Sequence, residues 1–281
     1  MAKKAASDTV LCGDCIEEMM KLPDGIAQLI IADPPYNLSK DFGPWKEVEQ
    51  KAAWLPWSRK WLAECVRILA PGGNIFVYGI HHHLCWLQCH LYELGMSYRR
   101  QVIWFYENGF AGYTKSLSAH YEPILWFSKG DGYTYHQIRE PYKSTERLKH
   151  KIIKNGKIWT PHPEGRLAGD VWRFPTLAGR RFRDEKVNHP TQKPLALTLR
   201  IVDHFSNIGD FVVVPFAGSG TECLAAAMRS RRYLGFELNP DYVELARSRI
   251  SRSNKDPESD LSTLQPPEPQ RAPRKSRADA R

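Results

Sequence analysis

Six apolar runs separated by helix-like segments are the feature that most limits the fold of this 281-residue chain. The runs are AQLIIAD (27–33), GNIFVYG (73–79), RQVIWFY (100–106), EPILWFS (122–128), DFVVVPF (210–216) and RYLGFEL (232–238). Strands that alternate with helices form mostly parallel sheets that are covered on both faces. The sequence therefore predicts an α/β domain.

The segment from residue 49 to residue 70 has the period of a helix. Its apolar residues recur every three or four positions and are Trp54, Trp57, Trp61, Cys65, Ile68 and Leu69. The sequence PGG at 71–73 ends the pattern. We expect a helix with one buried stripe, with a subunit interface as the alternative for part of it.

Composition limits the class of protein. An apolar content of 42% is enough for a full core, and a net charge of +9 indicates a polyanionic partner. The chain has no run of eighteen apolar residues, and MAKKAASD at its start lacks the apolar stretch of a signal peptide. We expect a cytoplasmic protein without a membrane span. Its six cysteines lie in apolar segments, which predicts reduced, buried thiols.

Two segments depart from the alternating pattern. Residues 139–186 contain thirteen Lys or Arg against six Asp or Glu, a local balance of +7. Residues 254–281 contain five prolines and no aromatic residue. A segment of that composition buries too little apolar surface to offset its ordering, so we expect a disordered tail.

The first predicted strand ends in Asp33-Pro34-Pro35-Tyr36. A tight turn alone needs neither an acid nor an aromatic ring. Proline fixes φ and so holds the neighbouring backbone still. This combination indicates a chemical role.

The second chemical feature is the turn Phe216-Ala217-Gly218-Ser219-Gly220-Thr221, which joins a strand to a helix. Glycines there let a ligand approach the backbone, and Glu237 at the end of the next strand can accept both hydroxyls of a ribose. Cys223 occupies the third glycine position of the dinucleotide fingerprint. S-adenosylmethionine, which has a ribose and a carboxylate but no phosphate, fits better than a dinucleotide.

Metal binding is the weaker interpretation of the remaining Cys and His residues. Cys12 and Cys15 have no second pair of that spacing, and consecutive histidines at 81–83 cannot all face one ion. We expect no metal, and a solvated helix start at the histidines.

With both motifs present, the chain resembles the DNA amino-methyltransferases, in which Asp-Pro-Pro-Tyr and Phe-x-Gly-x-Gly each end a strand of one seven-stranded sheet. The tetrapeptide comes first here, and the glycine turn follows about 180 residues later, which is the permuted order of the beta group. The resemblance implies a catalytic half (1–138), a target-recognition insert (139–186), a cofactor-binding half (187–253) and a tail (254–281).

Further stretches carry the resemblance, namely LCGDCIEEMMKLPDG near the start, HYEPILWFSKG (120–130) and NHPTQKPLAL (188–197). It implies that Asp14 lies against the cofactor adenine, and that Thr191 and Lys193 lie near the methionine carboxylate. The implied cofactor-binding residues are Asp14, Cys15, Asp33, Thr191, Lys193, Phe216, Gly218, Ser219, Gly220, Thr221 and Glu237. The family usually has an acid immediately before Pro-Phe, where this chain has Val214.

The resemblance also implies a mechanism that involves Asp33, Pro34, Pro35 and Tyr36. An exocyclic base amine is a poor nucleophile, because its lone pair is delocalised into the ring. Asp33 and the Pro34 carbonyl can accept its hydrogens, and Tyr36 offers a face for a base taken out of the helix.

The expected reaction is methylation of adenine N6 in double-stranded DNA, since members that act on cytosine more often have Ser in place of Asp33. The alternatives are cytosine N4, an RNA or protein amide, and an inactive binding module of the same fold.

The basic insert supplies most of the expected contacts to DNA. The predicted DNA-binding residues are Asn37, Lys149, Lys151, Arg166, Arg173, Arg180, Arg181 and Arg183. The aromatic residues among them, Trp159, His162, Trp172 and Phe174, favour DNA contact over a merely solvated surface. The resemblance implies a bacterial, nucleoid-associated protein and leaves open a homodimer and a cognate restriction endonuclease as partners.

Overall fold

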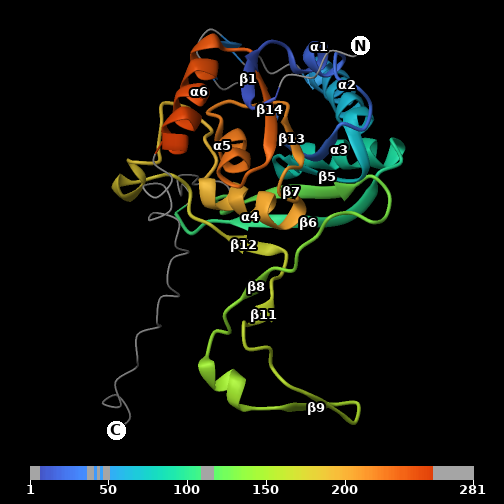
Figure 1. The fold of residues 1–281 in the computed structure, drawn as a ribbon, viewed down its shortest axis with the longest axis vertical. Coiled ribbons are helices and arrows are strands. Elements are labelled where there is room, and N and C mark those ends of the chain that lie inside the picture. The colour runs from blue at the N-terminus through green and yellow to red at the C-terminus, as the bar shows by residue number, and fades with distance from the viewer. Residues whose placement is uncertain (1–6, 37–40, 43–44, 47–50, 109–116, 256–281) are drawn as a thin grey trace.

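An eight-stranded sheet forms the centre of the computed structural model, which describes residues 7–36, 41–42, 45–46, 51–108 and 117–255 (Figure 1). In spatial order the strands are β1 (Thr9–Cys12), β14 (Arg232–Glu237), β13 (Phe211–Val214), β2 (Ala27–Ala32), β5 (Leu69–Tyr78), β7 (Tyr121–Ser128), β6 (Ser97–Phe105) and β12 (Val171–Arg173). All neighbouring strands are parallel except β7, which is antiparallel to both of its neighbours.

The parallel strands end at a common edge. Cys12 at the end of β1 pairs with Glu237 at the end of β14, and Ala32 at the end of β2 pairs with Val77 of β5. β2 also pairs with β13, which brings together the two halves of the chain on either side of the insert. The segments that follow β1, β2, β13 and β14 therefore meet at one edge.

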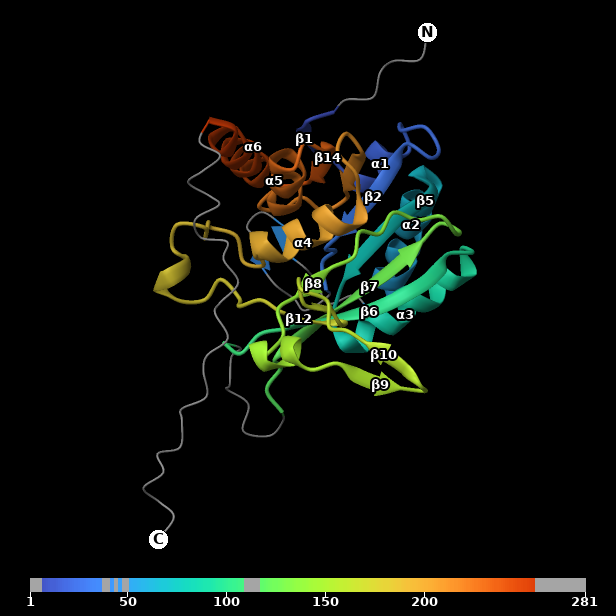
Figure 2. The same cartoon turned by 60° about the horizontal axis from the view of Figure 1, so that its bottom comes forward.

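Helices cover both faces of the sheet, as the alternating pattern predicts (Figures 1 and 2). One face carries α1 (Cys15–Met19), α2 (Lys51–Ile68) and α3 (His81–Glu93), and the other carries α4 (Leu195–Phe205), α5 (Thr221–Met228) and α6 (Pro240–Lys255). Side chains alternate between the faces: Leu29 and Ile31 of β2 pack with α4 and α5, whereas Ile30 packs with the other group.

The prediction of a Trp-rich helix with a buried stripe is confirmed by α2. Trp61, Cys65 and Ile68 are fully buried. The histidine run begins α3, and His81 and His82 are exposed there as expected. His83 is half-buried, and its Nδ1 lies 3.0 Å from the carbonyl oxygen of Tyr36.

The predicted fold class is confirmed, with one strand more than the seven expected. The additional strand, β12, comes from the basic insert and pairs with β6. Its residue Trp172 is only 3% exposed, and Phe174 is also buried in the core. The expectation that these two aromatic residues face DNA is therefore wrong, because the end of the insert returns to the sheet.

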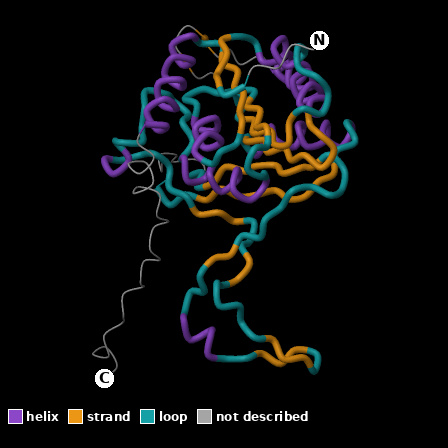
Figure 3. Tube along the Cα trace, in the orientation of Figure 1, coloured by secondary structure: helices purple, strands orange, loops and turns teal. Residues whose placement is uncertain are grey.

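The rest of the insert, residues 139–167, projects from the sheet as an arm (Figures 1 and 3). Along the arm lie β8 (Arg139–Glu140), the 3-10 helix η1 (Thr145–Lys149), β9 (Ile152–Lys154), β10 (Lys157–Trp159) and β11 (Arg166–Leu167). β8 pairs with β11 at its base, and β9 pairs with β10 in a hairpin. Asn155 and Gly156 both have positive φ, which suits a two-residue hairpin turn.

Other predictions concern single segments. A small antiparallel pair joins β3 (Asp41–Phe42) to β4 (Trp45–Lys46), and η2 (Arg180–Phe182) follows β12. α6 continues to Lys255, and residues 256–281 of the predicted tail lie outside the described residues. No helix within the described ranges is long and apolar enough to cross a membrane.

The six cysteines are all free, but burial divides them into two groups. Cys15, Cys65 and Cys223 are buried as predicted, whereas Cys12, Cys85 and Cys89 are exposed. The described part of the chain brings no three His, Cys, Asp or Glu side chains into a cluster that could hold a metal ion.

Candidate cofactor-binding and catalytic site

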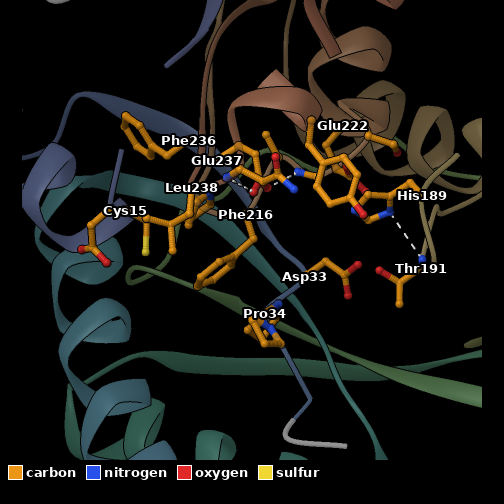
Figure 4. Close-up of a pocket in the computed structure, with 18 of the residues that line it drawn as sticks. Cys15, Asp33, Pro34, His189, Thr191, Phe216, Glu222, Phe236, Glu237 and Leu238 are labelled. Atoms are coloured by element: carbon orange, nitrogen blue, oxygen red, sulfur yellow. Dashed lines mark hydrogen bonds between the residues drawn. The ribbon is translucent and has the colours of Figure 1, made fainter. Parts of the chain in front are cut away.

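A pocket lies at the edge where the parallel strands end (Figure 4). Its space, open solvent included, is about 1070 Å³. The lining combines both sequence motifs with residues from four other segments: Gly13, Asp14, Cys15, Asp33, Pro34, Pro35, Tyr36, Trp57, His189, Thr191, Lys193, Pro215, Phe216, Ala217, Gly218, Ser219, Glu222, Phe236, Glu237, Leu238, Asn239 and Tyr242. Parallel pairing is the reason why segments so distant in sequence share this pocket.

Asp33 is the centre of a hydrogen-bonded group at one end of the pocket. Lys193 Nζ donates to Asp33 Oδ2 at 2.7 Å, and Tyr36 Oη donates to Asp33 Oδ1 at 2.7 Å. Tyr36 Oη also lies 3.3 Å from Glu122 Oε2, and Lys193 Nζ lies 3.8 Å from the same oxygen. Both oxygens of the Asp33 carboxylate therefore have a fixed direction.

Burial acts on the two donors in this group. Lys193 is only 4% exposed, and burial lowers its pKa, but Asp33 and Glu122 outweigh that effect, so the pKa is raised above its usual value. Burial next to Asp33 raises the pKa of Tyr36. Lys193 therefore stays charged and Tyr36 stays protonated at neutral pH, so both remain donors.

Two glycines of the turn have distinct structural reasons. Gly218 has φ of +48°, and a Cβ there would lie 2.9 Å from His189 Nε2. Gly220 has φ of +77°, and a Cβ there would lie 2.6 Å from the Cβ of Ala246 on α6. Gly218 thus keeps the pocket open, whereas Gly220 lets α5 pack closely against α6.

Arg249 of α6 holds the turn from behind. Its guanidinium donates to the Ser219 carbonyl and to Thr221 Oγ1. Thr221 is fully buried, and its hydroxyl lies 3.1 Å from Ser219 Oγ. Gly220 and Thr221 are not among the lining residues, so these two predicted cofactor-binding residues support the turn from outside the pocket.

Glu237 follows the strand register to the middle of the pocket. One carboxylate oxygen accepts the Gly218 amide at 2.9 Å, and the other accepts the Asn239 amide at 2.8 Å. Burial raises the pKa of Glu237, and these amides oppose the shift. Each oxygen retains a free lone-pair direction, so the carboxylate can accept further hydrogen bonds from a diol.

The other end of the pocket is mostly apolar. Cys15, Phe236 and Leu238 lie there (Figure 4), and Phe216 packs its ring 5.1 Å from that of Trp61. Asp14 Oδ1 accepts the amides of Ile16 and Glu17, which makes Asp14 the N-cap of α1. Asp14 also lines the pocket, and its contact with an adenine stays a prediction.

Sequence reasoning missed several lining residues, among them Trp57, His189, Glu222, Phe236, Leu238, Asn239 and Tyr242. Most belong to segments whose pattern matches an ordinary core or loop. His189 could have been found in NHPTQKP, and its ring lies 4.6 Å from that of Tyr242. Glu222 had a clearer signal, since it is an acid within the otherwise apolar stretch TECLAAAM.

The predicted DNA-binding residues are on the surface, apart from Asn37, which lies outside the described residues. Four of the remaining seven pair with carboxylates: Lys149 with Glu146, Arg166 with Glu140, Arg173 with Glu107 and Arg183 with Asp184. Lys149, Lys151 and Arg166 are exposed on the arm, and Arg173, Arg180, Arg181 and Arg183 are exposed near its return to the sheet. They therefore form no single cluster with the pocket residues.

The residues of the pocket fit S-adenosylmethionine. The apolar end suits a flat base, the free lone pairs of Glu237 suit the hydroxyls of a ribose, and the charged groups of the opposite end suit an amino acid. Gly218 leaves room where any larger residue would meet His189. This fold and pocket define the class of S-adenosylmethionine-dependent methyltransferases.

Comparison with known proteins gives the family. The N6/N4 family model described as DNA methylase matches residues 27–248. M1.MboII, a type II methyltransferase of Moraxella bovis, is 32% identical over 245 residues, which are 83% of this chain and 92% of that protein. YhdJ, a DNA adenine methyltransferase of Escherichia coli strain K12, is 32% identical over 246 residues, which are 86% of this chain and 82% of that protein.

A solved structure agrees with these relatives. The DNA modification methylase TTHA0409 of Thermus thermophilus, in complex with S-adenosyl-L-methionine, has a TM-score of 0.58 and 25% identity, and the match covers 87% of this chain and 93% of that one. The chain belongs to the N6/N4 DNA methylase family, and its cofactor is S-adenosylmethionine.

Replacement of Glu237 tests the middle of the pocket. We expect Glu237→Ala to weaken the binding of S-adenosylhomocysteine, measured by calorimetry, by about 1 to 3 kcal/mol, the scale for hydrogen bonds to a charged group. Glu17→Ala, on the exposed side of α1, is the matched control and should leave the affinity unchanged. An unchanged affinity of Glu237→Ala would mean that the ribose is held elsewhere.

The pH dependence of stability tests the burial of Glu222. Burial, with Asp33 nearby, raises its pKa from 4.5 to about 7. Between those values the native state keeps a proton that the unfolded state has lost, so the free energy of unfolding falls as the pH rises. Glu222→Gln removes this dependence.

We expect urea unfolding of the cofactor-free protein to show the difference. From pH 4.5 to pH 8, Glu222→Gln should gain on the order of 3 kcal/mol relative to the wild type. Glu244→Gln, on the exposed side of α6, should gain nothing. A constant difference between Glu222→Gln and the wild type across this range would contradict the raised pKa.

Proposed function

We propose that this protein transfers a methyl group from S-adenosylmethionine to the exocyclic N6 amine of adenine in double-stranded DNA. The observation that carries the proposal is the fixed Asp33 carboxylate, which lies beside Pro34 at the charged end of the cofactor pocket. The catalytic residues would be Asp33, Pro34, Pro35 and Tyr36.

The chemistry requires a more reactive amine. When bound, S-adenosylmethionine supplies a methyl group on a sulfonium that loses its charge in the transfer. Asp33 would accept one hydrogen of the amine and the Pro34 carbonyl another, so that the nitrogen lone pair is localised. Because two consecutive prolines fix the backbone, this carbonyl needs no reorganisation during the reaction.

Lys193 and Tyr36 would keep the Asp33 carboxylate in position. Their bonds to separate oxygens fix its rotation, while each oxygen keeps a lone pair for the amine. Both donors are buried, which strengthens these bonds. Thr191 lines the same end of the pocket and would contact the methionine carboxylate.

The target base would have to leave the helix, because its amine cannot reach a buried carboxylate while paired. Pro34 and Tyr36 also border a second, small cavity with Trp54, Tyr78 and His83. This cavity lies beside the tetrapeptide, on the side of α2 and α3. Its aromatic lining supports an extruded base that stacks near Tyr36.

Adenine is favoured over cytosine by two observations. The tetrapeptide begins with Asp33, where family members that act on cytosine more often have Ser. The Escherichia coli relative is by its name a DNA adenine methyltransferase. Cytosine N4 remains the second candidate because its amine needs the same chemistry.

The arm and the region around η2 would contact the DNA. At the hairpin Ile153 is 75% exposed and Trp159 is 61% exposed, beside the exposed Lys151, Lys154 and Lys157. Apolar side chains exposed among cations suit the grooves and phosphates of a duplex. The carboxylate partners of Lys149 and Arg166 are surface partners that contribute little and can be exchanged for phosphates.

Replacement of Asp33 tests the reaction and its product together. We expect Asp33→Asn to lower the rate of labelled methyl transfer to unmethylated DNA by about 100-fold or more, because the amide cannot withdraw the hydrogens of the amine as a carboxylate does. Mass spectrometry of nucleosides from DNA methylated by the wild type should show N6-methyladenine. Detection of N4-methylcytosine instead would decide for the second candidate.

The matched control is Asp131→Asn. Asp131 is 96% exposed and follows β7, whose antiparallel direction places it at the opposite edge of the sheet. This variant should transfer methyl groups at the wild-type rate. Transfer at that rate by Asp33→Asn would sink the mechanism.

Removal of positive charge tests the DNA surface. Each phosphate contact contributes close to one unit to the slope of log affinity against log salt. We expect Lys149→Ala with Lys151→Ala, and likewise Arg180→Ala with Arg181→Ala, to lower DNA affinity and reduce that slope by about 1 to 2. Fluorescence anisotropy at several salt concentrations measures both effects.

The control pair is Arg59→Ala with Lys60→Ala, which removes the same charge from the exposed side of α2. A slope that stays at the wild-type value for this pair would show that position matters. If the control pair reduces the slope as much as the arm variants do, only net charge acts and the proposed surface is wrong.

A further inference from the structure

Glu222 is a buried acid for which the proposed reaction has no use. It is the second residue of α5, directly after the glycine turn, and is only 4% exposed. Its side chain lines the pocket with Asp33, Lys193 and Ser219. In Figure 4 it lies at the same end as His189, Thr191 and Asp33, opposite Cys15 and Phe236.

One oxygen of this carboxylate lacks a partner. Six side-chain N or O atoms of the described residues are buried without a hydrogen bond, and Glu222 Oε1 is the one that belongs to an acid. The other five are the neutral groups of Ser58, Trp61, Tyr78, Thr198 and Ser253. A buried carboxylate oxygen without a donor is costly, and such a group calls for a functional reason.

The charged neighbours of Glu222 leave this oxygen open. Asp33 opposes its ionisation, whereas Lys193 and Arg249 favour it, and Tyr78 and Cys223 also lie within electrostatic range. Lys193 already bonds to Asp33 at 2.7 Å, and Arg249 bonds to the Ser219 carbonyl and to Thr221. Neither cation donates a hydrogen bond to Oε1.

The chemistry of the cofactor supplies the missing donor. With the ribose at Glu237 and the base at the apolar end, the methionine part extends toward Glu222, Asp33 and Thr191. That part carries an α-ammonium group with three N–H donors. Val214, which stands where the resembled family has an acid, is fully buried and has no acceptor in its side chain.

We propose that Glu222 binds the α-ammonium group of S-adenosylmethionine, in place of the acid that is absent at Val214. The proposal rests on the assignment of this pocket to the cofactor. It makes Glu222 a specificity residue, because a nucleoside thioether without the amino group would leave the carboxylate unpaired. The raised pKa of Glu222 means that an incoming ammonium favours the ionised form and releases a proton near neutral pH.

Calorimetry with two ligands tests this contact without any measurement of catalysis. The ligands are S-adenosylhomocysteine and its analogue that lacks the α-amino group. We expect Glu222→Gln to weaken the binding of S-adenosylhomocysteine by about tenfold or more, since an ion pair is lost, and to leave the binding of the desamino analogue within about twofold. The wild type should prefer S-adenosylhomocysteine, and the variant should lose most of that preference.

Controls separate this inference from the pocket assignment. Glu244→Gln should bind both ligands as the wild type does, and Glu237→Ala should weaken both, because both contain a ribose. If Glu237→Ala weakens both and Glu222→Gln weakens neither, or weakens both equally, the pocket assignment holds and the ammonium contact is refuted. If Glu237→Ala changes nothing, the pocket assignment itself fails. Glu222→Asp, which keeps the charge, should retain part of the preference.

Discussion

The buried ion pair between Lys193 and Asp33 joins segments 160 residues apart and organises the candidate catalytic end of the pocket. A buried pair of this kind is weak evidence for stability, because desolvation offsets most of its attraction. Its value here is directional. With Tyr36 on the second oxygen, the carboxylate has one orientation, and Glu122 completes the charge balance around Lys193. A site that must withdraw hydrogens from a weak nucleophile needs that fixed geometry.

The sheet explains how such distant segments meet. β2 and β13 are parallel neighbours, so the tetrapeptide after β2 and the glycine turn after β13 emerge at the same edge. β14 adds Glu237 one strand further along, and its carboxylate binds the Gly218 amide of the turn. The permuted order of the motifs along the chain has no effect on this arrangement, because strand order in space and not in sequence decides which ends are neighbours.

The charges of the protein are divided between two environments with different roles. Lys193, Asp33 and Glu222 are buried around the pocket, where each partner or its absence has a large effect. The arm carries its charges at the surface, where carboxylate partners are weak and exchangeable. Buried charges therefore fix geometry at the cofactor, whereas exposed charges suit a long-range, salt-dependent attraction to a polyanion.

The sequence by itself determined the α/β class, the Trp-rich helix and both motifs, because apolar period, glycine and proline act locally on the backbone. It also pointed to Asp33, Gly218 and Glu237, whose roles depend on their positions at strand ends. Only the tertiary structure decided that Trp172 belongs to an eighth strand, that Lys193 faces Asp33, and that an oxygen of Glu222 has no partner. These three facts depend on contacts between segments far apart in the chain. No local pattern can encode them, since each side chain acquires its environment only when the sheet is assembled.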